Sequence, residues 1–151
     1  MANGKFRQGL YTVRHPEKYI GDPNKVRYMS SWEANAHAYF DNNPHIIRWG
    51  SEILAIPYIH PVDGELHKYY PDYYIEYYNS KGVLIKEIIE VKPEKQINRP
   101  TTRGKSKKTQ LTEAVTYAIN QAKWEYARAF CTKHGINFRV INEHHIFGTN
   151  K

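Results

Sequence analysis

The chain has 151 residues, and its 22 Lys and Arg against 15 Asp and Glu give a formal net charge of +7. With 40% apolar and 14% aromatic residues, the composition predicts a packed core and excludes a disordered chain. We expect no membrane partner and a location inside a cell, because no stretch reaches the roughly 18 apolar residues of a membrane span and no secretory signal is seen. The positive charge indicates a polyanionic partner, nucleic acid in particular.

The first predicted elements are an N-terminal arm and a short helix. Residues 1–29 are polar and interrupted by prolines and glycines, which predicts an ordered but extended arm. Ser30 and Glu33 have the spacing of a helix capping box, and apolar residues then recur at helical spacing as far as Asn43, before Pro44. We therefore expect one short helix between the arm and the strands that follow.

Four short apolar runs come next, at residues 46–52, 53–60, 65–78 and 83–92. Turn-forming residues at 61–64 and 79–82 separate the last three runs, which predicts an antiparallel meander. A long helix is predicted over residues 109–134, with one apolar face and a stop at Gly135, and residues 136–141 resemble a closing strand. The expected apolar face consists of Leu111, Val115, Ala118, Ala122, Tyr126 and Phe130. The order of elements indicates one α/β domain over residues 1–151, a central mixed sheet flanked by helices.

Two carboxylates are expected to meet on the central strands. In the run 83–92, alternation places Glu90 and Lys92 on one face. Pro71 has no N–H and interrupts the preceding strand, so a kink there would turn Asp72 toward Glu90. Neighbouring carboxylates stay ionised most readily around a cation, and Mg²⁺ suits them because it also accepts water and phosphate oxygens. With Lys92 to orient water or offset charge, these residues predict a phosphodiester-hydrolysing site.

The Glu-x-Lys triplet also has a structural explanation. About one such triplet is expected by chance in a chain of this composition. An exposed ion pair between Glu90 and Lys92 would account for it without any catalytic role.

Most of the basic charge lies in one segment, residues 93–108, which prolines, a glycine and polar residues mark as a loop. It is interpreted either as a solvated connector or as a loop that grips phosphates. Its basic residues are Lys95, Arg99, Arg103, Lys105, Lys107 and Lys108.

Pro71-Asp72 followed by Glu90-Val91-Lys92 resembles the signature of the PD-(D/E)xK nucleases, and Glu33 matches the acidic residue that this superfamily often adds from the preceding helix. Within the superfamily, the chain is similar to the TnsA-like nucleases and to the head completion endonucleases of T-even-type tailed phages. This resemblance implies a restriction-endonuclease-like fold and cleavage of double-stranded or branched DNA with Mg²⁺, or Mn²⁺ as a substitute. It also implies a role in finishing phage heads, with head or portal proteins as partners, in the host cytoplasm and in association with the virion.

The resemblance assigns roles to individual residues. Glu33, Asp72 and Glu90 would be metal ligands, and Lys92 the catalytic lysine. Lys123, with Asn120 one turn before it, matches a helix motif of the family and would contact phosphate or support the site. A solvated helix face is the alternative for both, and Glu33 has the alternative of a plain helix cap.

Two other functions remain open from the sequence. A non-catalytic DNA-binding or head-tail joining protein would need the basic segment but not the acidic residues and Lys92 together. A zinc module is the second alternative, with Cys131, His134, His144 and His145 as ligands. Against it, a lone cysteine on a helix is more often buried as a small hydrophobic residue.

Overall fold

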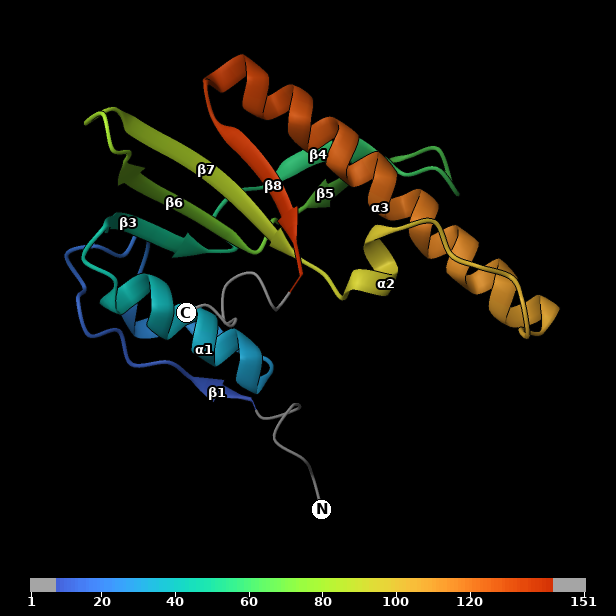
Figure 1. Ribbon diagram of the computed structural model, residues 1–151, viewed down its shortest axis with the longest axis horizontal. Coiled ribbons are helices and arrows are strands. Elements are labelled where there is room, and N and C mark those ends of the chain that lie inside the picture. The colour runs from blue at the N-terminus through green and yellow to red at the C-terminus, as the bar shows by residue number, and fades with distance from the viewer. Residues whose placement is uncertain (1–7, 143–151) are drawn as a thin grey trace.

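A mixed α/β architecture is seen in the computed structural model, which describes residues 8–142 (Figure 1). The helices are α1 (Ser31–Asn42), α2 (Glu94–Ile97) and α3 (Lys107–His134), with a short 3-10 turn at Pro23–Lys25. The strands are β1 (Gly9–Leu10), β2 (Arg27–Tyr28), β3 (Ile46–Ser51), β4 (Ile56–Ile59), β5 (Leu66–Tyr69), β6 (Tyr73–Tyr78), β7 (Leu84–Val91) and β8 (Asn137–Ile141). Within the described residues, no helix has the length and apolar content needed to cross a membrane.

The central sheet has the strand order β3-β6-β7-β8. β6 is antiparallel to both β3 and β7, whereas β8 pairs in parallel with β7. The parallel pair needs a long crossover, and α3 provides it. The predicted α/β fold with a central mixed sheet is therefore confirmed.

The predicted meander is wrong in one respect. The run 65–78 forms two strands, β5 and β6, which are separated at residues 70–72, where Pro71 removes a ladder donor. β5 pairs with β4 in a separate two-stranded sheet, while β6 lies between β3 and β7. The interruption expected at Pro71 is present, and the chain changes sheets there.

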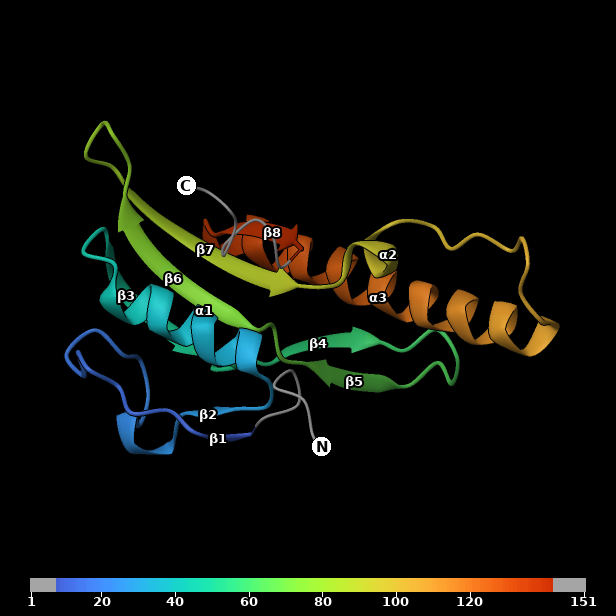
Figure 2. The same ribbon diagram turned by 60° about the horizontal axis from the view of Figure 1, so that its bottom comes forward.

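Two hydrophobic clusters cover the two faces of the central sheet. Phe40 of α1 and Ile89 of β7 belong to one cluster, while Ile88 of β7 packs with Trp124 and Cys131 of α3 in the other. Neighbouring residues of β7 thus point to opposite faces, as the period of two in a strand requires. α1 and α3 consequently lie on opposite sides of the sheet (Figure 2).

α3 begins earlier and buries a different face than the sequence predicts. Ser106 caps the helix by accepting the Thr109 N–H at 3.2 Å, so α3 starts at Lys107. On the predicted face, Leu111 is 67% exposed and Tyr126, farther along the helix, is 39% exposed. This face lies on the side of α3 opposite the buried one, because Leu111 and Trp124 are about 140° apart around the helix. The residues that α3 buries are Asn120, Trp124, Ala127 and Cys131, from its middle onward.

The N-terminal arm, which the structure describes over residues 8–29, is held against α1. Buried Asp41, near the end of α1, accepts hydrogen bonds from the Tyr11 hydroxyl at 2.9 Å and from the N–H groups of Arg14 at 2.7 Å and His15 at 3.1 Å. The Lys18 ammonium donates to three carbonyls at the same helix end. These carbonyls lack helical partners and favour a cation.

Candidate active site

Three strand ends meet at one end of the central sheet. Tyr73, the first residue of β6, pairs with the last residue of β3 and with Ile89 near the end of β7. A carboxylate lies at each of these ends, since Glu52 follows β3, Asp72 precedes β6, and Glu90 is next to last in β7. The antiparallel register therefore gathers acidic residues that are far apart in the sequence.

Asp72 and Glu90 are in direct contact. The Asp72 N–H donates to Glu90 Oε1 at 3.3 Å, and the Tyr69 hydroxyl donates to the same oxygen at 2.8 Å. Asp72 Oδ2 accepts the Val91 N–H at 2.8 Å. Burial, and then repulsion by Glu90, raises the pKa of Asp72 far above its ordinary value. Ionising both carboxyl groups at this buried place is thus unfavourable, and a bound cation would offset their repulsion.

Lys92 forms an ion pair with one member of this pair. Its Nζ lies 3.4 Å from Glu90 Oε2. The pair is not an exposed surface ion pair, because Glu90 is only 5% exposed and the Lys92 side chain is 26% exposed. The Lys92 N–H also donates to the Ile141 carbonyl at 2.9 Å, which ties this end of β7 to β8.

A group of three carboxylates lies beside Glu90. One oxygen each of Glu33, Glu52 and Asp72 lies within 4.8 Å of the others. The side chains come from α1, the end of β3 and the start of β6, so the group spans three elements. Carboxylate oxygens are the ligands that hard divalent cations prefer, and three of them in this space can hold such an ion.

Glu52 is the member of this group that the sequence analysis missed. Its N–H donates to the Asp72 carbonyl at 3.1 Å, and its φ of 53° lies in the left-handed region, which is strained for a glutamate. Burial raises the pKa of Glu52, and the charges of Glu33 and Glu90 add to this effect. The one signal in the sequence was its position at the end of a predicted strand. The start of β6, with Asp72, pairs next to this end.

Glu33 caps α1 differently from the expected capping box. Ser30 Oγ accepts the Glu33 N–H at 3.2 Å, as predicted. The Glu33 carboxylate, however, accepts the N–H of Met29 at 2.6 Å instead of that of Ser30. The capping bond therefore uses one oxygen of a carboxylate that also belongs to the acidic group.

Lys123 and Asn120 do not lie on a solvated helix face. Asn120 is 4% exposed. Lys123 is half-buried, with Nζ 5.6 Å from the centroid of the Tyr69 ring. Burial, and then the charge of Lys92, lowers the pKa of Lys123. Because Tyr69 bonds Glu90, Lys123 belongs to the surroundings of the carboxylates.

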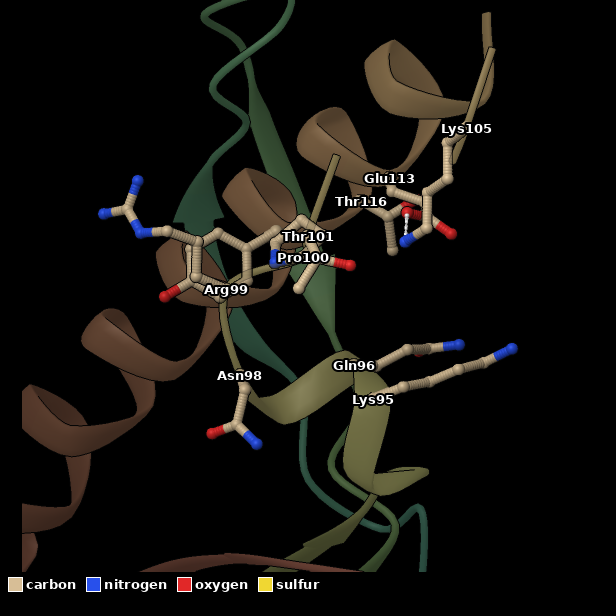
Figure 3. Close-up of a pocket in the computed structure, with 10 residues that line it drawn as sticks. Lys95, Gln96, Asn98, Arg99, Pro100, Thr101, Lys105, Glu113 and Thr116 are labelled. Atoms are coloured by element: carbon tan, nitrogen blue, oxygen red, sulfur yellow. Dashed lines mark hydrogen bonds and ion pairs between the residues drawn. The ribbon is translucent and has the colours of Figure 1, made fainter. Parts of the chain in front are cut away.

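The basic segment 93–108 is a loop only in its middle. Residues 94–97 form α2, and Lys107 and Lys108 lie in the first turn of α3. The segment runs along α3 and encloses with it a pocket of about 340 Å³ (Figure 3). There Lys105 forms a 2.7 Å ion pair with Glu113, and the Arg99 guanidinium lies 6.0 Å from the centroid of the Tyr117 ring. The basic side chains of the segment that are exposed to solvent are those of Lys95, Arg99, Arg103, Lys107 and Lys108. We call residues 93–108 the basic arm.

The position of Cys131 argues against the zinc module that the sequence left open. Cys131 is 2% exposed in the cluster between the sheet and α3, and burial raises the pKa of its thiol to about 11. It behaves as a buried small hydrophobic residue. The ring of His134 packs 4.5 Å from that of Phe130, and the other two proposed ligands, at 144 and 145, lie outside the described residues.

The mixed sheet, with acidic residues and a lysine gathered where its antiparallel strands end, defines a nuclease of the restriction-endonuclease-like class. The sequence-family model of the TnsA-like endonuclease N-terminal domain matches residues 43–143, and the chain belongs to this family. It is also similar to the head completion nuclease of Enterobacteria phage T4, with 34% identity over 139 residues that cover 89% of this chain and 90% of that protein. The predictions of the nuclease superfamily and of an enzyme are confirmed.

Proposed function

We propose that this endonuclease hydrolyses phosphodiester bonds in DNA with a divalent cation and acts in the completion of phage heads. The observation that carries the proposal is the group formed by Glu33, Glu52 and Asp72, whose oxygens lie within 4.8 Å of one another. The ion pair of Glu90 with Lys92 beside this group supports it. A binding protein without catalysis would need neither feature.

Mg²⁺ is the proposed cation, with Mn²⁺ as a substitute. All three side chains offer hard oxygen ligands. Burial, and then repulsion between the carboxylates, raises the pKa values of Asp72 and Glu52, and a divalent ion would offset both effects. When bound, such an ion supplies a Lewis acid toward a phosphate oxygen and a more acidic water.

Glu90 and Lys92 have linked roles in this proposal. Glu90 completes the ligand set with Glu33, Glu52 and Asp72, and its Oε2 holds the Lys92 ammonium at 3.4 Å. The ammonium then orients the attacking water or offsets the negative charge that builds up on the phosphate. The Tyr69 hydroxyl, bonded to Glu90 Oε1, is a positioning group for this carboxylate.

The DNA would be held through its phosphates. Lys123 is the proposed phosphate contact next to the carboxylates, because its side chain is close to both Tyr69 and Lys92. Farther out, the basic arm supplies positive charge for phosphate contacts, which carry no sequence information, so we propose that this binding is independent of sequence. The proposed arm contacts are Lys95, Arg99, Arg103, Lys105, Lys107 and Lys108. Double-stranded or branched DNA is the proposed substrate.

The biological setting rests on the phage T4 relative, which is named as a head completion nuclease. We propose that this chain works likewise in the host cytoplasm, associates with the virion, and meets phage head or portal proteins there. Association with isolated phage heads, measured by co-sedimentation, tests this part separately from cleavage.

The activity is tested with linear, nicked and branched DNA, with Mg²⁺ or with EDTA. Cleavage should require the cation, and Lys92→Ala should suppress turnover while changing the affinity for Mn²⁺ much less than Asp72→Asn does. DNA binding by the parent without cation-dependent cleavage of any of the three substrates would instead favour the non-catalytic DNA-binding protein.

A further inference from the structure

We propose a second metal site in this protein, at the turn of the β4–β5 hairpin, that binds a transition metal such as Zn²⁺. His60, Asp63 and His67 each offer one ligand atom, and these atoms lie within 4.8 Å of one another. The group shares no residue with the carboxylates at the end of the central sheet. Its chemistry also differs, because two imidazoles and one carboxylate suit Zn²⁺, whereas oxygen ligands suit Mg²⁺.

The hairpin register brings the two imidazoles together. Tyr58 pairs with His67 across β4 and β5, so these side chains share a face, and His60, two residues after Tyr58, lies on the same face. Residues 61–64 form the turn, closed by a bond from the Gly64 N–H to the His60 carbonyl at 2.8 Å. Gly64 provides the positive φ of 70° that this turn needs. The two imidazole centroids are 4.4 Å apart as a result.

Asp63 is held between the imidazoles by the backbone. The Glu65 N–H donates to Asp63 Oδ1 at 2.8 Å. Asp63 Oδ2 lies 2.8 Å from His67 Nε2, and Oδ1 lies 3.9 Å from His60 Nδ1. Two ligands of one tetrahedral Zn²⁺, each at ~2.0–2.2 Å from the ion, are about 3.3 Å apart. The hydrogen-bonded Oδ2–Nε2 separation is shorter than this value, and the Oδ1–Nδ1 separation, which involves the other carboxylate oxygen, is longer.

Small side-chain rotations therefore suffice to close the site. The side chains of Asp63 and His67 are 45% and 40% exposed, which leaves them free to adjust and leaves an open path for an ion. His60 is the fixed member, at 16% exposure. Three protein ligands leave one position for water.

The site faces α3, which gives a bound ion a structural consequence. The Tyr58 ring lies beneath both imidazoles, at 6.0 Å from His60 and 5.9 Å from His67, and it also packs 6.5 Å from Tyr126 of α3. A metal would join both strands of the hairpin at its turn and so resist opening of the hairpin below α3. Its binding should accordingly raise the thermal midpoint.

The test uses the full chain, treated with EDTA, dialysed, and titrated with Zn²⁺ in excess Mg²⁺, which occupies the all-carboxylate group. The parent should bind one more equivalent of Zn²⁺ than His67→Gln or Asp63→Asn, and Zn²⁺ should raise its midpoint by about 5 °C or more. The imidazole ¹⁵N signals of His60 and His67 should shift on addition of Zn²⁺. The matched control is His15→Gln, which removes a histidine with a carboxylate neighbour, Glu17 at 3.7 Å, but outside this group.

The outcomes separate clearly. Loss of one equivalent in both hairpin variants, with His15→Gln like the parent, supports the site. Equal Zn²⁺ stoichiometry in the parent, His67→Gln and Asp63→Asn overturns it, as do unshifted signals from His60 and His67. The ¹⁵N signals are read on the parent protein, so misfolding of a variant would not decide the result.

Discussion

Replacing Asp72 by Asn should stabilise the metal-free protein while it removes nuclease activity. Burial and the charge of Glu90 raise the pKa of Asp72 from 3.8 to about 8. A carboxyl group with a raised pKa in the folded state destabilises the fold above its unfolded pKa, and the loss grows as pH rises toward the folded pKa. Asn removes this charge, and its carbonyl oxygen can still accept the Val91 N–H that Asp72 accepts at 2.8 Å.

The size of the effect follows from the pKa. Each pKa unit corresponds to about 1.4 kcal/mol, and pH 7 lies roughly three units above the unfolded pKa of Asp72, so Asp72→Asn should gain on the order of 4 kcal/mol. For a chain of this size, that free energy raises the thermal midpoint by about 8 to 16 °C. The gain should become small as the pH falls to about 4 and vanish below it, where Asp72 becomes protonated in the unfolded state as well.

The assay compares the thermal midpoints of parent and variant in EDTA between pH 4 and pH 8. Asp63→Asn is the matched control, because the Glu65 N–H and His67 lower the pKa of exposed Asp63, so the same substitution there should give no gain. Added Mg²⁺ should stabilise the parent and not Asp72→Asn. The reasoning is refuted if the midpoint of Asp72→Asn in EDTA at pH 7 does not exceed that of the parent, or if the difference between them does not grow with pH.

Three further results are expected. Glu52→Gln should abolish cleavage and retain DNA binding, because the substitution removes only the negative charge that would bind the cation. Cleavage at the parental rate would show that Glu52 is not part of the site. Glu33→Gln should also lose activity yet melt within a couple of degrees of the parent, because its amide oxygen can still accept the Met29 N–H, whereas Glu33→Ala should be destabilised by about 1 kcal/mol. Neutralising three residues of the basic arm should weaken binding to all DNA sequences alike, as measured by fluorescence anisotropy. The slope of log affinity against log salt concentration should fall by up to about 0.9 per lost contact. A loss of binding to one sequence only would contradict binding through phosphates. These residues are Arg99, Arg103 and Lys105.

The part of the site that local rules control could be predicted from the sequence. Alternation along one strand placed Glu90 beside Lys92, and the missing N–H of Pro71 indicated the interruption that precedes Asp72. Glu52 could not be found in this way, because it joins the site only through the pairing of β3 with β6. The meander expected from sequence order would have paired β6 with β4 instead, and strand pairing between distant segments leaves little local signal.

The face of α3 shows a second limit. The predicted face includes Leu111, which is exposed, whereas the helix buries Trp124 on its other side. Periodicity shows which residues share a side of a helix, but it does not show which side the sheet covers. The hairpin group of His60 and His67 depends likewise on a cross-strand register, which spacing alone does not determine.

The burial of Cys131 has a practical consequence for following this protein on DNA. The chain has one cysteine, and with its thiol pKa raised to about 11, less than about one thiol in a thousand is in the reactive thiolate form at pH 7.5. A cysteine introduced at an exposed, uncharged position of the basic arm, such as Thr102→Cys, would therefore react with a maleimide dye far faster than Cys131 does. Motions of the arm can thus be recorded by fluorescence in the otherwise natural sequence, without first removing a core residue.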